Sequence, residues 1–331
     1  MRLLAFAAVL LAMTTAANAQ DRPPVAIAVH GGAGTLGRGD ITPEQDAEYR
    51  AALETALRTG EQVLLDGGSA MDAVVATIET MENSPLFNAG KGAVLTAEGK
   101  AELDASVMDG GTGQAGAIAS VTTVKNPIKL ARLVMEQSGH VLLVSDGAEK
   151  FADETDVERV ENDYFLTDRR REALKRIQEQ EENQQGRALG IGEGKFGTVG
   201  CVALDADGNL AAGTSTGGLS NKRFGRVGDS PIVGAGTWAD ANVAVSCTGQ
   251  GEYFIRLGIA RDLAARVAHL NEPAADAAIA VIDGLTTAGG LGGLVGMNAD
   301  GEAFYSFNTE GMYRGHIGRD GELSVGIYED E

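Results

Sequence analysis

Apolar and polar positions follow two different periods along the chain, and each period predicts a different element. Short apolar runs that end in glycine, such as VAIAVHGGAG at 25–34, are typical of strands that lead into turns. Other apolar residues follow the i, i+3, i+4, i+7 spacing of one face of a helix: Met71, Val74, Val75 and Ile78. Both patterns occur in each half of the chain, which predicts an α+β protein with helices covering a largely antiparallel double sheet.

Helix starts are marked by capping residues. Thr42 with Gln45, and Ser69 with Asp72, have the spacing of a cap whose side chain meets the third helical residue. Further strands are predicted at 103–109, 116–124 and 141–145, and a hairpin begins at about residue 198. The segment 251–267 has the pattern of one continuous helix.

One segment in the middle of the chain differs from the rest. Residues 154–196 are densely charged and poor in large apolar side chains, which predicts a linker that is partly helical and partly mobile. The linker ends at Gly197, and the strand-like run TVGCVAL starts directly after it at Thr198.

The first 19 residues have the composition of a secretory signal. Arg2 precedes an apolar core from Leu3 to Met13, and Ala17-Asn18-Ala19 has the small residues of a cleavage site. The apolar core is too short for a permanent membrane span, and no later stretch approaches about 20 apolar residues. The sequence therefore predicts a secreted, periplasmic protein without a membrane helix.

Charge and cysteine content narrow the classes of partner. The net charge of −20 argues against nucleic acid, and an anionic substrate would need a local cation. No Cys/His cluster with metal-ligand spacing occurs. Cys201 and Cys247 lie in apolar runs, which favours two buried thiols but leaves a single disulfide open.

Two glycine motifs are poor matches to the sites they suggest. Residues 32–37 fit G-x-G-x-x-G, but the following 25 residues read as helix rather than as the strand that a dinucleotide site requires. Residues 213–217 fit the G-x-S-x-G of hydrolases, but the glycine-rich stretch after them cannot form the helix of a nucleophile elbow.

Thr198 offers a different route to a nucleophile. A threonine hydroxyl can use its own α-amino group as base, provided that the Gly197–Thr198 bond is cut. That amine has an ordinary pKa of about 7.7–8.0, so part of it is neutral at working pH.

A series of motifs around this position resembles one family. FGTVG (196–200), TSTGG (214–218), NKRFGRVGDSP (221–231), VGAGTWA (233–239) and SCTGQGE (246–252) occur in order. With HGGAG (30–34), SPLFNAGKGAVLT (84–96), ELDASVMDG (102–110) and FNTEGMYRG (307–315), they resemble the plant-type asparaginase / isoaspartyl peptidase family of N-terminal nucleophile hydrolases.

This resemblance implies a four-layer α/β/β/α sandwich that forms one structural domain. The precursor would cut itself at Gly197–Thr198 into an alpha subunit, residues 20–197, and a beta subunit, residues 198–331. The two chains would stay together and assemble as an (alpha-beta)2 dimer.

The resemblance also implies roles for individual residues. Thr198 would be the nucleophile, with Thr216 bonding its free amine and Asn88 close by. Thr248 and the N–H of Gly249 would form the oxyanion hole. The remaining substrate contacts would come from Arg226, which suits an α-carboxylate, from Asp229, which suits an α-ammonium, and from Gly249 and Gly251.

A structural sodium ion held by backbone carbonyls is implied as well, and no other cofactor is expected. Its implied ligands lie in one loop: Met81, Glu82, Ser84, Phe87, Ala89 and Lys91. Gln250 departs from the small residue common at this place, which leaves the substrate preference open.

The hypothesis is a hydrolase that cleaves L-asparagine and β-aspartyl dipeptides through a β-aspartyl–Thr198 ester. One alternative is a glycosylasparaginase, although that branch is expected to have Asp before the threonine, where this chain has Gly197. Another is a non-catalytic exported amino-acid-binding protein, which the presence of Thr198, Thr216 and Thr248 together argues against.

Overall fold

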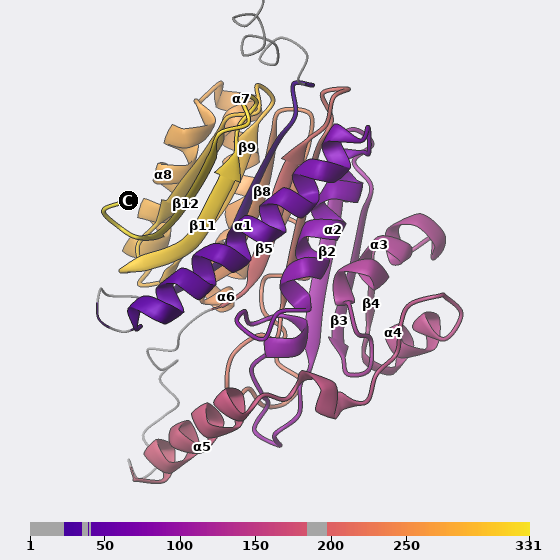
Figure 1. Ribbon diagram of the computed structural model, residues 1–331, viewed down its shortest axis with the longest axis vertical. Helices are drawn as coiled ribbons and strands as arrows, with labels where there is room; N and C mark the ends of the chain where they lie inside the picture. Colours follow the sequence, from indigo (N-terminus) through magenta and orange to yellow (C-terminus); the bar gives the residue numbers. More distant parts are fainter. Residues whose placement is uncertain (1–22, 35–38, 40, 184–196) are drawn as a thin grey trace, which may run out of the picture.

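The computed structural model describes residues 23–34, 39, 41–183 and 197–331. The predicted signal at 1–19 and the last part of the predicted linker, 184–196, lie outside the described residues. Within these residues the elements form four layers, with two β-sheets face to face and helices on both outer faces (Figure 1).

The larger sheet has the strand order β12-β11-β1-β5-β6-β2-β3-β4, and the smaller one β10-β9-β8-β7. Neighbouring strands are antiparallel except for β3 and β4, which are parallel. This agrees with the largely antiparallel double sheet expected from the pattern. The strands are β1 (Ala26–Gly34), β2 (Leu103–Asp109), β3 (Ala115–Val121), β4 (Leu142–Val144), β5 (Val199–Leu204), β6 (Leu210–Thr216), β7 (Thr237–Ala239), β8 (Val243–Gly249), β9 (Gly292–Asn298), β10 (Ala303–Phe307), β11 (Gly311–Ile317) and β12 (Leu323–Tyr328).

Helices α1, α2 and α3 pack on the outer face of the larger sheet, and α7 and α8 on that of the smaller one (Figure 1). The helices are α1 (Pro43–Leu65), α2 (Ala70–Glu82), α3 (Pro127–Gln137), α4 (Ser145–Ala152), α5 (Asp168–Asn183), α6 (Gly251–Leu257), α7 (Ile259–Leu270) and α8 (Ala274–Thr287), with 3₁₀ helices η1 (Gly90–Gly92) and η2 (Asn162–Phe165). Both predicted capping boxes, at Thr42 and Ser69, are confirmed.

The predicted continuous helix over 251–267 is wrong. The chain forms α6 and α7 instead, and Gly258 between them adopts a left-handed conformation with φ of 62°. Glycine takes this conformation readily because it has no Cβ, so one residue ends the first helix and redirects the chain into the second.

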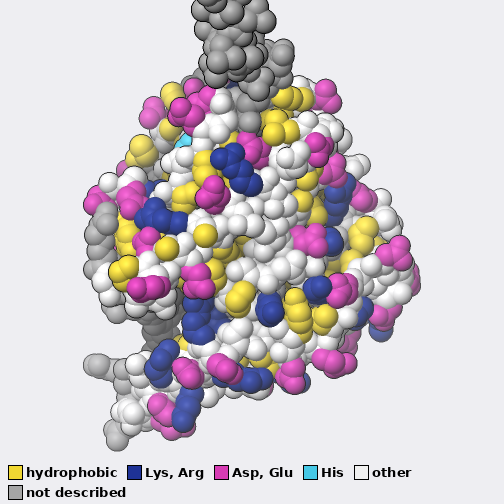
Figure 2. Space-filling view, viewed as in Figure 1, with side chains coloured by type: hydrophobic (Ala, Val, Ile, Leu, Met, Phe, Trp, Pro, Cys, Tyr) yellow, Lys and Arg dark blue, Asp and Glu magenta, His cyan; other side chains and the backbone are white. Residues whose placement is uncertain are grey.

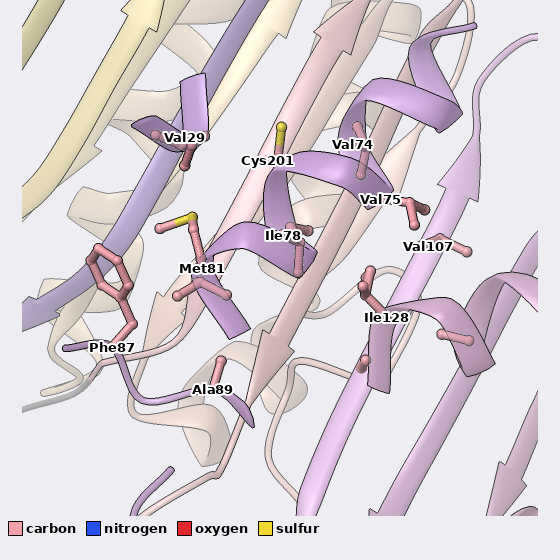
Figure 3. Close-up of a cluster of buried hydrophobic side chains, with 14 of the residues drawn as sticks. Val29, Val74, Val75, Ile78, Met81, Phe87, Ala89, Val107, Ile128 and Cys201 are labelled. Atoms are coloured by element: carbon pink, nitrogen blue, oxygen red, sulfur yellow. The ribbon is translucent and has the colours of Figure 1, made fainter. Parts of the chain in front are cut away.

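Three apolar clusters fill the spaces between the four layers. The largest joins α1, α2 and α3 to the larger sheet, and Figure 3 shows Ile78 and Met81 of α2 beside Cys201 of β5 and Val29 of β1. The second lies under α7 and α8, and the third between the sheets. Cys201 and Cys247 are free and buried in different clusters, so the question left open by the sequence is settled in favour of two thiols.

The first part of the predicted linker is partly helical, as its composition predicted. It contains η2 and α5, and α5 lies at the lower edge of the molecule in Figure 1. Arg169 donates to the carbonyl of Leu86, and Arg170 donates to the carbonyl of Gly92 at 2.6 Å. Two arginines therefore attach the start of α5 to the loop that follows α2.

Acidic and basic side chains are intermixed on the face shown in Figure 2. None of the described helices has the length and apolar character needed to cross a membrane.

Candidate active site

Two threonines meet where neighbouring strands of the larger sheet begin and end. Thr198 directly precedes β5 and Thr216 ends β6, and the antiparallel register of these strands places them opposite each other. The Thr198 Oγ1 donates to Thr216 Oγ1 at 3.0 Å, and Thr216 Oγ1 also accepts from the N–H of Gly218 at 3.0 Å. The hydroxyl of Thr198, the residue predicted from the sequence as the nucleophile, is thus held by the hydroxyl of Thr216.

A narrow pocket opens at this hydroxyl pair. It brings together the predicted residues Thr198, Thr216, Arg226, Asp229 and Gly249 with Gly197 of the predicted cleavage site. Its other lining residues are Gly218, Leu219, Gly228 and Ser230. The remaining predicted residues Asn88, Thr248 and Gly251 are not among the residues that line the pocket.

Asn88 connects the loop after α2 to both sides of the site. Its backbone N–H donates to the carbonyl of Gly197 at 3.0 Å. Its side chain donates to the carbonyl of Gly218 at 2.9 Å and accepts from the N–H of Val94 at 2.8 Å. A buried amide therefore fixes the carbonyl of the predicted cleavage bond relative to the end of β6.

The end of β8 has space only for glycine. Gly249 has φ of 152°, and a Cβ there would come within 2.6 Å of the Cα of Gly292. The hydroxyl of Thr248, one residue earlier, accepts from the N–H of Ala33 at 3.4 Å. Gln250 makes two hydrogen bonds to the backbone of Leu291. Its backbone N–H donates to the Leu291 carbonyl, and its side-chain Oε1 accepts from the Leu291 N–H. The long side chain at 250 is thus turned toward Leu291.

Asp229 is a buried carboxylate without a complete set of partners. Asp229 is one of the residues that line the pocket, and its buried Oδ2 has no hydrogen bond among the described residues. Burial raises the pKa of Asp229 to about 7, although its own backbone N–H and the charge of Arg226 act in the opposite direction. Gly251 leaves room for both side chains, because a Cβ there would lie 2.9 Å from Arg226 Nη2 and 2.9 Å from Asp229 Oδ1.

Sequence reasoning missed His30. Its Nδ1 donates to the backbone carbonyl of Thr198 at 3.1 Å, and its Nε2 lies 2.9 Å from Ser246 Oγ. Burial lowers the pKa of His30 to about 3, against the opposing effect of the bond to Thr198, so the ring is neutral. A neutral ring that donates through Nδ1 must accept at Nε2, which makes Ser246 the donor. The available signals were its place in an apolar run and at the start of the HGGAG motif (30–34), from which no role for the side chain was inferred.

The contact of Ser246 continues into a buried chain of hydroxyl groups between the sheets. Thr214 Oγ1 lies 2.7 Å from Ser246 Oγ and 2.5 Å from Thr237 Oγ1. Ser106 Oγ lies 2.8 Å from Thr237 Oγ1 and 2.6 Å from the carbonyl of Ser230, beside Asp229. A continuous chain of hydrogen-bonding groups therefore connects the carbonyl of Thr198 to the loop between β6 and β7, which carries Asp229.

His30 makes the stability of the fold depend on pH. An unfolded chain protonates this ring below its ordinary pKa of 6.5, whereas the folded chain resists protonation down to about 3. The stability due to the neutral ring is thus complete above pH 6.5 and is lost as the pH falls toward 3, by about 1.4 kcal/mol per pH unit. We expect His30→Gln to remove this part of the slope, measured by urea unfolding between pH 4 and 7. Equal slopes in the two proteins would contradict the assignment of a neutral ring.

The loop after α2 is crowded with backbone carbonyls. A Cβ at Gly90 would collide with the carbonyl of Glu82, and one at Gly92 would collide with that of Phe87. The side chain of Glu82 instead accepts from Ser215 Oγ at 2.6 Å and from the N–H of Ile128 at 3.0 Å, and burial raises its pKa to about 8. Glycine at positions 90 and 92 therefore allows the carbonyls of Glu82 and Phe87 to lie close against the turn. No cluster of three or more His, Cys, Asp or Glu that could hold a metal is found in the described part of the chain.

Comparison with known proteins identifies the family. The family model described as asparaginase matches residues 23–327. The "Isoaspartyl peptidase" of Escherichia coli (strain K12) is 46% identical over 310 residues, covering 92% of this chain and 96% of the relative. The "Isoaspartyl peptidase/L-asparaginase" of Xenopus laevis is 40% identical over 308 residues, covering 92% and 96%, and that of Mus musculus is 40% identical over 303 residues, covering 91% and 90%.

The chain is therefore a hydrolase of mixed α and β structure, and it belongs to the asparaginase family.

Proposed function

We propose that the protein hydrolyses L-asparagine and β-aspartyl (isoaspartyl) dipeptides, with Thr198 as an N-terminal nucleophile. The observation that carries this proposal is the hydroxyl of Thr198, bonded to Thr216 at 3.0 Å and opening on a pocket that also holds Arg226 and Asp229. The relatives named as isoaspartyl peptidases and L-asparaginases support the same substrates.

The first step is cleavage of the chain itself. The Thr198 hydroxyl oxygen attacks the carbonyl carbon of Gly197, the C–N bond to Thr198 breaks, and the nitrogen takes up the hydroxyl proton. Water then hydrolyses the resulting ester and leaves a free α-amine on Thr198. The N–H of Asn88, 3.0 Å from the Gly197 oxygen, is placed to stabilise the charge that develops there.

The same hydroxyl then serves the substrate. The α-amine of Thr198 accepts the hydroxyl proton as Oγ attacks the side-chain carbonyl of the substrate, and it returns a proton to the leaving ammonia or amine. A β-aspartyl ester on Thr198 remains, and water releases aspartate by the reverse order of proton transfers. Thr248 and the N–H of Gly249 are assigned to the oxyanion of each tetrahedral intermediate.

Two charged side chains select the free amino-acid end of the substrate. Arg226 offers paired donors to an α-carboxylate, and the unpartnered Asp229 Oδ2 offers an acceptor to an α-ammonium. A glycosylasparagine would present the same end, so glycosylasparaginase activity is the second candidate; the absence of Asp at position 197 argues against it.

Further parts of the proposal concern support and location. The carbonyls of Met81, Glu82, Ser84, Phe87, Ala89 and Lys91 would hold a sodium ion, which would stiffen the loop that carries Asn88. Residues 1–19 would direct the chain to the periplasm, and the cut protein would assemble as an (alpha-beta)2 dimer.

The test combines mass with turnover. We expect purified protein to contain two chains, one of which begins with Thr198, and to hydrolyse L-asparagine and β-aspartyl-leucine in preference to a glycosylasparagine. A single uncut chain without activity would overturn the proposal. Preferential turnover of the glycosylasparagine would establish the second candidate instead.

A further inference from the structure

Arg226 is held by a carboxylate that lies outside the pocket lining. Its Nε donates to Glu252 Oε1 at 2.9 Å, and its Nη2 donates to Glu252 Oε2 at 3.0 Å. The guanidinium is the more buried partner, with 18% of its side chain exposed against 40% for Glu252. The pair is therefore bidentate, the geometry that restrains an arginine most strongly.

Glu252 occupies only one edge of the Arg226 guanidinium, the edge formed by Nε and Nη2. A guanidinium has five N–H donors, and Glu252 takes one on Nε and one on Nη2. Within the described residues, the two N–H groups of Nη1 and the second of Nη2 remain without a hydrogen-bond partner. Nη1 lies next to the pocket lining, since a Cβ at Gly228 would lie 2.7 Å from it and one at Gly218 would lie 3.5 Å from it. A second carboxylate can thus accept hydrogen bonds from Nη1 and Nη2 while Glu252 keeps its bonds to Nε and Nη2.

Glu252 is positioned by helix α6, which begins close to the pocket residue Gly249. It lies in the first turn of α6, where a negative charge is favoured by the helix dipole. This turn starts two residues after Gly249, which lines the pocket beside Thr198. Although burial acts in the opposite direction, the hydrogen bonds and charge of Arg226 hold the pKa of Glu252 below its ordinary value, so the carboxylate is charged at neutral pH.

We propose that Glu252 is a positioning residue that orients Arg226 and thereby makes the enzyme select substrates with a free α-carboxylate. The inference rests on the proposed function, because it takes Arg226 as the carboxylate-binding residue. Arginine loses side-chain entropy when it is immobilised, and the pair with Glu252 meets this cost before the substrate arrives. Glu252 is not among the residues that line the pocket beside Thr198, so we expect its removal to weaken binding of the carboxylate more than it slows the chemical step.

The experiment measures competitive inhibition constants of two matched ligands, L-aspartate and L-aspartic acid α-amide, on the processed enzyme. They differ in the group offered to Arg226. For Glu252→Ala we expect about tenfold weaker binding of L-aspartate, unchanged binding of the amide, and a kcat for L-asparagine within about threefold of wild type. Glu252→Asp should restore part of the loss.

Two further variants separate the inference from the proposed function. Glu272→Ala removes the partner of Arg266 on α7, a surface pair at 3.2 Å, and should change neither constant. Arg226→Ala should abolish the preference for L-aspartate. Tighter binding of L-aspartate to Glu252→Ala, or an equal loss for both ligands, would overturn the role of Glu252 while leaving Arg226 in place. An unchanged preference in Arg226→Ala would instead refute the carboxylate site in the proposed function.

Discussion

Replacing Thr198 with alanine is expected to leave the chain uncut and to lower activity toward L-asparagine by about 10⁴-fold or more, as for loss of a nucleophile elsewhere. The reason is that one hydroxyl serves both reactions, and the structure holds this hydroxyl by a hydrogen bond to Thr216. The measurement is intact mass together with kcat/KM.

The conservative variant sharpens this result. Thr198→Ser keeps the hydroxyl and the future amine but lacks the methyl group that restricts χ1, so it should cut slowly and retain partial activity. Thr55→Ala, which removes an exposed hydroxyl bonded within α1, is the control and should behave as wild type. Cleavage in Thr198→Ala would show that another group attacks the Gly197–Thr198 bond.

The elements that the sequence predicted well depend on local chemistry. The caps at Thr42 and Ser69 require only a side chain and the backbone three residues away, and both formed as expected. The break at Gly258 escaped prediction because the apolar spacing on its two sides is compatible with one helix. The strand order β12-β11-β1-β5-β6-β2-β3-β4 was beyond reach, since it joins strands that are far apart in the chain.

The same distinction applies to the site. Thr198, Thr216, Arg226 and Asp229 were selected from short motifs, and the fold brings them to one pocket. His30 and Glu252 were missed because their roles arise from contacts across the fold, such as the bond from His30 to a carbonyl 168 residues away. Motifs thus selected several of the residues that line the pocket, while the groups that hold them became visible only in three dimensions.

Asp229 is the site at which stability and function are most clearly opposed. Its folded-state pKa of about 7 lies above the ordinary value of 3.8, because burial penalises the charged form. Between these two values the folded state binds more protons than the unfolded state, so this residue lowers stability as the pH rises toward 7. We infer that the buried Asp229 carboxylate serves to bind a cation, because a bound cation would supply the partner that its Oδ2 lacks.

Asp229→Asn is therefore expected to unfold at a higher urea concentration than wild type at pH 7 and above, and still to cut itself. Its kcat/KM for L-asparagine should fall by about 10²-fold or more, because the variant loses the charge opposite the α-ammonium. The pH profile provides the sharper readout. In wild type, kcat/KM should fall on the acid side as Asp229 takes up a proton near pH 7 and as the Thr198 amine does so, whereas the variant should retain only the limb of the amine. If the variant kept both limbs, or if it lost stability together with activity, Asp229 would have a structural role and the α-ammonium would need another acceptor.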